Sequence, residues 1–199
     1  DAVALAITTP VGVVVHTGDF KVDYTPIDGG VMDLHRFAEL GKAGVLLLLS
    51  DSTNAERKGF TMSESSVGGV FDDIFSETPK NRIMVATFSS NIHRIQQIVN
   101  SAYKYGRKVA IIGRSMVNAV KTSIELDYLN MPDNTLIDIS EIKNYTDDKL
   151  VIITTGSQGE TMSALSRIAA NEHKQVSIRP GDKIIISASS IPGNEKNIS

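Results

Sequence analysis

Residues 82–94 read RIMVATFSSNIHR, and this stretch decides the class of fold. Its first part is mostly apolar and β-prone, which is typical of a short buried strand. A polar turn follows at 88–91, and the next apolar residues recur at helical spacing: Ile92, Ile95, Ile98 and Val99. The stretch therefore predicts a strand that leads directly into a helix covering about 91–104.

The same pattern of a short apolar strand followed by a polar turn recurs along the chain. Strands are predicted at 11–16, 45–49, 82–87, 108–112, 150–154 and 183–187, and the strand at 45–49 is expected to be buried on both faces. Helices are predicted at 31–40, 63–77, 91–104, 115–129 and 161–171. Strands and helices that alternate with short connections predict an α/β fold, a doubly wound and mainly parallel sheet flanked by helices.

Composition excludes several classes of function. The 199 residues are 41% hydrophobic and 22% charged, as in an ordinary soluble globular protein. Cysteine is absent, which excludes disulfides, thiolate metal sites and cysteine nucleophiles and suits a reducing compartment. The longest apolar run, Val45–Leu49, is too short to span a bilayer, so no membrane partner is expected. The net charge of −3 gives no overall attraction to nucleic acid, although a local basic strip would be averaged away.

Four polar clusters follow predicted strands, at 16–19 (HTGD), 50–54 (SDSTN), 88–94 (FSSNIHR) and 154–160 (TTGSQGE). In parallel sheets, ligands and catalytic groups gather at the carboxyl ends of the strands. We therefore expect one composite site. Its carboxylates, hydroxyls, imidazole and glycine amides suit a metal and phosphate groups better than an apolar ligand.

Two acidic residues stand out in the first two clusters. Asp19 is a hard oxygen donor that can bind or bridge divalent metals, or simply a turn-forming residue. Asp51 can orient a catalytic histidine or a metal-bound water, or close its loop through an Asx turn. His16 is expected to have a supporting or structural role.

The later clusters suggest anion binding. Ser90 or Asn91 is a natural N-cap, and the free amides of a helix start can bind phosphate. His93 and Arg94 gain nothing from the dipole at that end of a helix, and a bound phosphate would explain their presence. Simple capping of the helix start fits the local sequence about as well as phosphate binding does.

The loop at 154–160 lacks the Walker A and dinucleotide-binding patterns, yet its glycine amides can approach an oxyanion closely. Arg114 can grip phosphate or remain a solvated surface residue. His35 and His173 are predicted to be surface groups on helices.

Taken in this order, the clusters resemble the ribonuclease J family, nucleases of the metallo-β-lactamase fold in the β-CASP group. The resemblance rests on VHTGDFK at 15–21, LLSDSTN at 48–54, SNIHR at 90–94, TGSQGE at 155–160 and IPGNEK at 191–196. It implies that residues 1–54 are the end of a metallo-β-lactamase αββα lobe. Residues 55–199 are then a β-CASP domain, incomplete at its C-terminal end, and the chain is a piece of a longer protein.

The resemblance also implies roles for individual residues. Asp19 matches the catalytic aspartate that bridges both ions of a two-zinc site, and Asp51 matches an acidic residue that positions a catalytic histidine. The family's RNA channel falls at two sets of residues, whose individual contacts we infer from helix-start chemistry: Ser90, Asn91, His93 and Arg94, and Gly156, Ser157, Gln158 and Gly159. The family's His-x-His-x-Asp-His zinc motif is absent from these 199 residues.

The resemblance thus implies part of a cytoplasmic, zinc-dependent ribonuclease that hydrolyses phosphodiesters with metal-activated water, as a 5′ exonuclease, an endonuclease or both. The substrate is RNA with a 5′-monophosphate, and the intact protein is expected to form homo-oligomers. The chain by itself is expected to be inactive and to hold zinc poorly. Two other readings remain open, a non-catalytic α/β module that binds a nucleotide or sugar phosphate, and a scaffold domain for ribonuclease assembly.

Overall fold

The computed structural model describes residues 3–27, 29–160 and 163–188. The chain folds into two compact units, Asp1–Val67 and Gly68–Ser199. The sequence placed a division after Asn54, on the basis of the family's domains, and that assignment stays a prediction.

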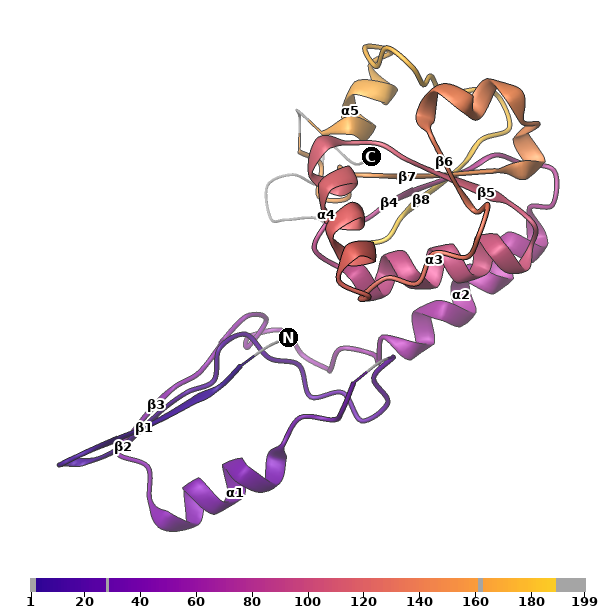
Figure 1. Cartoon of the computed structure of the whole chain (residues 1–199). Helices are drawn as coiled ribbons and strands as arrows, with labels where there is room; N and C mark the ends of the chain where they lie inside the picture. The colour runs from indigo at the N-terminus through magenta and orange to yellow at the C-terminus, as the bar shows by residue number, and fades with distance from the viewer. Residues whose placement is uncertain (1–2, 28, 161–162, 189–199) are drawn as a thin grey trace. The chain divides into compact units, whose positions relative to one another are not determined.

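The first unit contains a three-stranded sheet and one helix (Figure 1). Strand β1 (Leu5–Thr9) pairs antiparallel with β2 (Gly12–His16), and β2 pairs parallel with β3 (Leu47–Leu49). Helix α1 (Leu34–Ala43) connects β2 to β3 and begins after Asp33, whose side chain accepts a hydrogen bond from the Arg36 amide. The predicted strands at 11–16 and 45–49 are confirmed, whereas β1 was not predicted.

The expectation that the strand at 45–49 is buried on both faces was wrong. Leu47, Leu48 and Leu49 are 48%, 58% and 45% exposed. The reason is that β3 lies at the edge of a small sheet with a single helix, so the described residues are too few to cover both of its faces. An apolar run identifies a strand but not what packs against it.

The second unit is built on a five-stranded, fully parallel sheet with strand order β6-β5-β7-β4-β8. Its strands are β4 (Ile83–Ala86), β5 (Lys108–Ile111), β6 (Leu136–Ile137), β7 (Leu150–Thr154) and β8 (Lys183–Ile186). The central strands β4 and β7 are buried along their whole length. The four strands predicted in this unit are confirmed, and β6 is an addition.

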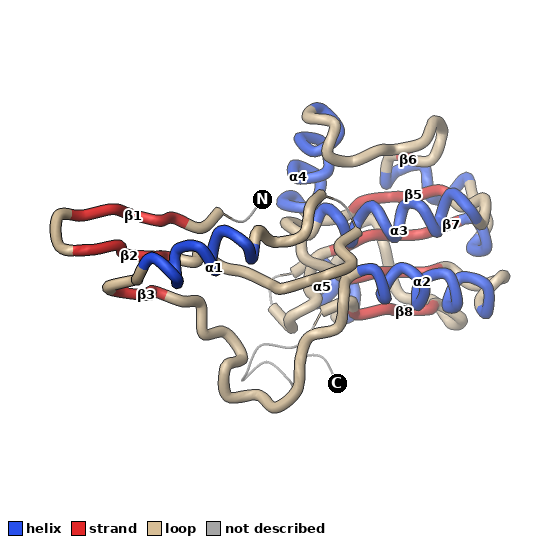
Figure 2. Tube along the Cα trace, turned by 90° about the horizontal axis from the view of Figure 1, so that it is seen from below, coloured by secondary structure: helices blue, strands red, loops and turns tan. Residues whose placement is uncertain are grey.

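Helices cover both faces of this sheet. Helices α2 (Ser65–Glu77) and α3 (Ile92–Lys104) lie on one face and α5 (Ala164–Ala169) on the other (Figures 1 and 2). Helix α4 (Arg114–Glu125) and two 3-10 helices, η1 (Ile139–Asn144) and η2 (Asp147–Lys149), complete the unit. The predicted α/β class, a parallel sheet flanked by helices, is confirmed. No helix within the described ranges is long and apolar enough to cross a membrane.

A buried ion pair joins the amino ends of two neighbouring strands. Arg82 precedes β4 and donates to both carboxylate oxygens of Asp182, which precedes β8, at 2.9 and 2.5 Å. The two side chains are only 1% and 3% exposed. Since a buried charge is costly without its partner, this pair fixes the edge strand β8 against β4.

The connections create a topological switch point at the carboxyl ends of the strands, the edge of the sheet opposite the Arg82–Asp182 pair. Strand β4 leads into α3 on one face, whereas its neighbour β7 leads into α5 on the other face (Figure 1). The chain therefore leaves these two adjacent strands in opposite directions. In open α/β sheets, the crevice that this creates at the carboxyl ends of the strands is where ligands bind.

Candidate functional site

In the first unit, the two acidic clusters lie side by side. His16 at the end of β2 is in register with Leu49 at the end of β3, and the Thr17 amide continues the ladder by donating to the Leu49 carbonyl at 3.0 Å. The Asp51 amide then donates to the Thr17 hydroxyl at 3.0 Å. Both loops therefore leave the same edge of the sheet, as the order of strands predicts for a parallel pair.

The carboxylate of Asp51 is held by donors from both loops. Its Oδ1 accepts a hydrogen bond from the Thr53 amide at 2.9 Å. The Thr53 amide and hydroxyl lower the pKa of Asp51 most, and the amides of Phe20 and Ser52 lower it further. The Asx turn that the sequence offered as an alternative is therefore present. The Phe20 contact also brings this carboxylate to the residue that follows Asp19.

Asp19 is exposed at the end of a tight turn. Gly18 has a φ of +61°, and a Cβ at that position would lie 2.6 Å from the Val3 carbonyl oxygen, so only glycine fits. The Gly18 amide donates to Nδ1 of His16 at 3.0 Å, which ties the imidazole to the turn. His16 thus supports the loop that carries Asp19.

The described residues do not fit a complete zinc site. Among them, no group of three or more histidine, cysteine, aspartate or glutamate side chains is placed to hold a metal ion. Zinc in proteins is held by three or four such side chains. Asp19 can supply one ligand, and the remainder would have to come from outside the described part of the chain.

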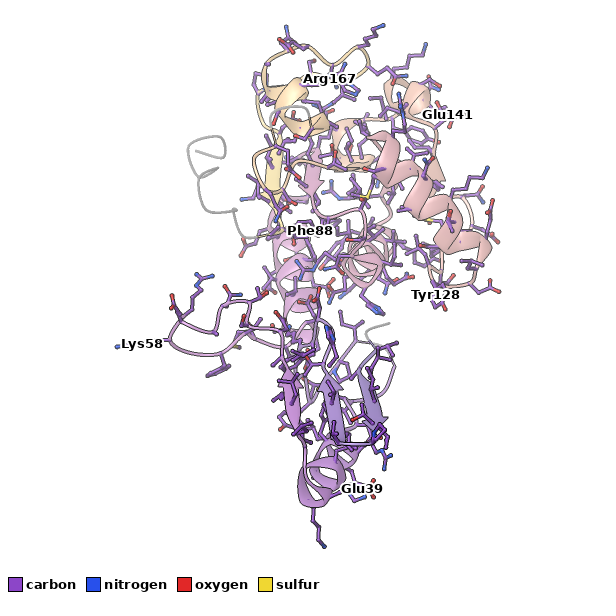
Figure 3. All side chains as sticks on the ribbon, turned by 90° about the vertical axis from the view of Figure 1, so that its left-hand side faces the viewer. Glu39, Lys58, Phe88, Tyr128, Glu141 and Arg167 are labelled. Carbon is purple, nitrogen blue, oxygen red and sulfur yellow. The ribbon has the colours of Figure 1, made fainter. Side chains whose placement is uncertain are left out.

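In the second unit, a polar crevice of about 350 Å³ lies at the switch point between β4 and β7. Its lining comes from the turns after the two strands and from the start of α4: Thr87, Phe88, Ser89, Ser90, Ser115, Thr155, Gly156, Glu160 and Ser163. Figure 3 labels Phe88. The hydroxyl oxygen of Thr87, a residue only 1% exposed, is buried and has no hydrogen-bond partner among the described residues. The crevice is therefore rich in hydroxyls, and one buried hydroxyl beside it lacks a partner among the described residues.

The predicted residues of the turn after β4 take different positions. Asn91 is the N-cap of α3, since its Oδ1 accepts a hydrogen bond from the Arg94 amide at 3.0 Å. Ser90 lines the crevice, and His93 is exposed. Nη1 of Arg94 donates to the Ser187 hydroxyl at 2.5 Å and to its carbonyl at 3.3 Å. The guanidinium of Arg94 thus holds the end of β8.

The loop after β7 needs glycine at its first turn. Gly156 has a φ of +109°, and a Cβ there would lie 2.3 Å from Oγ of Ser163. Ser157 is buried, and the Gln158 amide donates to Glu160 at 3.1 Å. The Gly159 amide closes the turn on the Gly156 carbonyl at 3.4 Å. Gly156 is the member of this predicted group that lines the crevice.

One prediction about a histidine was wrong. His173 was expected on the exposed surface of a helix, but it follows α5 and is half-buried. Its Nδ1 accepts hydrogen bonds from the amides of Gln175 and Val176, and it lines a second cavity with Arg114 and Arg167. Helical spacing ran past the true end of α5. By contrast, His35 is exposed on α1, as predicted.

Sequence reasoning also missed Thr87, Ser115 and Ser163 as crevice residues. Thr87 and Ser115 were detectable in principle, because each stands within a few residues of a predicted strand end. Ser163 is the N-cap of α5, and its place in the crevice depends on how the loop folds back over the sheet.

These features define a class: an α/β domain with a polar, hydroxyl-lined crevice at the switch point of a parallel sheet, in a chain that also carries paired acidic loops. Residues 80–199 match the family model described as "Ribonuclease J, beta-CASP domain". The chain therefore belongs to the ribonuclease J family.

Curated relatives agree over the whole chain. It is 50% identical over 199 residues to "Ribonuclease J" of Helicobacter pylori strain 26695, and this alignment covers 100% of the present chain and 29% of that protein. The chain is also 50% identical over 194 residues to "Ribonuclease J" of Synechocystis, and the alignment covers 98% of the present chain and 30% of that protein. For "Ribonuclease J" of Thermus thermophilus it is 48% over 198 residues, covering 100% and 34%. The chain thus spans about a third of the length of these relatives.

Proposed function

We propose that this chain is part of a ribonuclease that processes or degrades RNA, and that the crevice of its second unit holds the RNA backbone. The observation that carries the proposal is the hydroxyl-lined crevice at the switch point, in a chain that shares half of its residues with proteins named ribonuclease J. Hydroxyls and backbone amides contact phosphate without reading bases, so the grip is independent of sequence.

The acidic loops of the first unit supply the polar groups for hydrolysis in this proposal. Because its hydrogen bonds lower the pKa of Asp51, this carboxylate is ionised at neutral pH and accepts hydrogen bonds. It can therefore orient a histidine N–H or a water molecule near the scissile phosphate. We assign Asp19 as one ligand of a zinc site whose other ligands lie outside the described residues, and zinc when bound would lower the pKa of an attacking water.

The same proposal extends to the substrate, the mode of cleavage and the cellular setting. The substrate would be RNA with a 5′-monophosphate, cut as an exonuclease, an endonuclease or both. The protein would act in the cytoplasm as a homo-oligomer. These features rest on membership of the family.

RNA binding by the chain itself is the first test. A fluorescein-labelled, single-stranded oligoribonucleotide is titrated with the 199-residue chain, and anisotropy is followed at several salt concentrations. Ser90→Glu places a negative charge in the crevice and should weaken binding by about tenfold, which corresponds to the loss of one favourable phosphate contact. Thr122→Glu puts the same charge on the exposed surface of α4 and should leave affinity unchanged. Equal effects of both variants would refute the assignment of the crevice.

Hydrolysis is tested in the protein at its full natural length. It should cleave 5′-monophosphate RNA and lose activity when zinc is chelated. A non-catalytic phosphate-binding module would bind RNA equally well with and without the chelator and would cleave nothing.

A further inference from the structure

A second cavity, of about 690 Å³, lies beside the crevice in the same unit. We call it the basic pocket. Six of its residues carry polar or charged side chains: Arg114, Ser115, Asn118, Thr155, Arg167 and His173. Ser115 and Thr155 line the crevice as well, so the two hollows share a wall. Figure 3 labels one lining residue of each hollow, Arg167 in the basic pocket and Phe88 in the crevice.

The basic pocket concentrates positive charge. Two of its residues are arginines, and no carboxylate stands among the described residues that line it. Arg114 and Arg167 are both exposed, and neither makes a side-chain hydrogen bond or ion pair within the ranges that the structure describes. By contrast, Arg82 and Arg179 of the same unit are paired with aspartates. Two unpaired guanidinium groups at one cavity form a site that favours an anion.

His173 adds a donor of fixed direction. Its Nδ1 accepts hydrogen bonds from the amides of Gln175 at 3.3 Å and Val176 at 3.2 Å. The proton of the neutral ring is therefore on Nε2. Burial, and then the charge of Arg167, lower the pKa of His173. At neutral pH the imidazole thus presents an uncharged Nε2–H donor beside the two arginines.

The start of α4 contributes backbone donors. Gly113 is the N-cap and has no side chain to satisfy the amides of the first turn, and the first helical bond runs from the Val117 amide to the Gly113 carbonyl at 2.9 Å. Such free amides, together with the positive end of the helix dipole, favour an anion.

An independent observation indicates a ligand in the crevice that adjoins the basic pocket. The buried hydroxyl oxygen of Thr87 has no hydrogen-bond partner among the described residues, and Thr87 lines the crevice that Ser115 and Thr155 connect to the basic pocket. A ligand that occupies both hollows would satisfy this hydroxyl at one end and the arginines at the other.

We propose that the basic pocket is a second phosphate-binding subsite, in which Arg114, Arg167 and Nε2 of His173 hold a backbone phosphate of the RNA strand that occupies the crevice. This inference rests on the proposed function for the identity of the strand. The chemistry of the subsite itself requires only a phosphate group.

The test uses the whole 199-residue chain and two probes, inorganic phosphate and a single-stranded oligoribonucleotide. In ¹H–¹⁵N spectra, phosphate should shift the Ser115 amide and the His173 ring nitrogen. Arg114→Gln and Arg167→Gln should each weaken oligoribonucleotide binding by about tenfold, as expected for the loss of a charge-assisted hydrogen bond. Each should also reduce the slope of log K against log salt by about 0.7. Lys121→Gln is the matched control, because this exposed lysine of α4 lies outside the pocket.

The outcomes separate the inference from the proposed function. Shifts at Ser115 and His173 with inorganic phosphate support the subsite even if the chain does not bind RNA, in which case the proposed function fails alone. Shifts with the oligoribonucleotide only support the subsite and identify the polymer as its ligand. Unperturbed spectra with both probes would overturn the inference, as would arginine variants that behave like Lys121→Gln.

Discussion

Gly156→Ala gives the sharpest test of the loop that forms the crevice. At a φ of +109°, alanine is strained by about 1–3 kcal/mol. The new methyl group would lie 2.3 Å from Oγ of Ser163 and 2.9 Å from Cβ of Leu165, and overpacking of this kind costs about 1–3 kcal/mol. Loss of unfolded-state entropy offsets about 0.4–1 kcal/mol. The net destabilisation should therefore be about 1–6 kcal/mol.

Urea unfolding of the chain, followed by circular dichroism, measures this value against two other glycines. Gly106 has a φ of +63° with nothing within 4 Å of an added Cβ, so Gly106→Ala should cost only about 1–2 kcal/mol of backbone strain. Gly69 lies in α2 with ordinary geometry and open space, so Gly69→Ala should stabilise by up to about 1 kcal/mol. If Gly156→Ala costs no more than Gly106→Ala, the close packing of this loop on α5 is wrong.

Three further predictions concern other parts of the chain. Arg82→Met leaves the Asp182 carboxylate buried without its partner and should lower the free energy of unfolding by about 3–5 kcal/mol, whereas adding Asp182→Leu should recover most of the loss; equal urea midpoints for the single variant and the parent would contradict this. Asp51 should titrate below an ordinary aspartate in carboxyl ¹³C spectra, so its contribution to stability is present above the unfolded-state pKa and is lost as the pH falls through the lower folded-state pKa. Thr53→Val removes the hydroxyl that donates to Asp51 and should raise the pKa of Asp51. An unchanged midpoint of the Asp51 titration would disprove that this hydroxyl lowers the pKa. The 199-residue chain mixed with zinc and labelled 5′-monophosphate RNA should show no cleavage, because its described residues offer no cluster of three metal ligands. Robust turnover would contradict the proposal that the other zinc ligands lie outside the described residues.

The sequence predicted the elements better than their surroundings. The apolar runs and the turn residues after them located β4, β5, β7 and β8, because each of these strands is a short apolar run that ends at a polar turn. The two-residue β6 and the 3-10 helices were missed, since such short elements carry no periodicity. Burial of 45–49 was misjudged because burial depends on other segments, which a local pattern does not contain.

The candidate site was predictable in its loops but not in its individual contacts. That the Asp19 and Asp51 loops lie at one edge follows from parallel pairing of β2 and β3. That Arg94 holds Ser187 does not follow from the chain near Arg94, because the two residues are far apart in sequence. His173 shows the same limit, since its place beside Arg167 depends on how the chain after α5 folds back.

The central claim is that Asp19 and Asp51 act together in RNA hydrolysis, and a double-mutant cycle tests it most directly. Single-turnover cleavage of 5′-monophosphate RNA is measured for the natural full-length protein and for Asp19→Asn, Asp51→Asn and the double variant, with the exposed Asp133→Asn as control. Each single change should slow cleavage by about 100-fold or more. The double variant should be no slower than the slower single one, because residues that act as a unit are not additive. Wild-type rates in either single variant, or losses that multiply in the double variant, would contradict the claim.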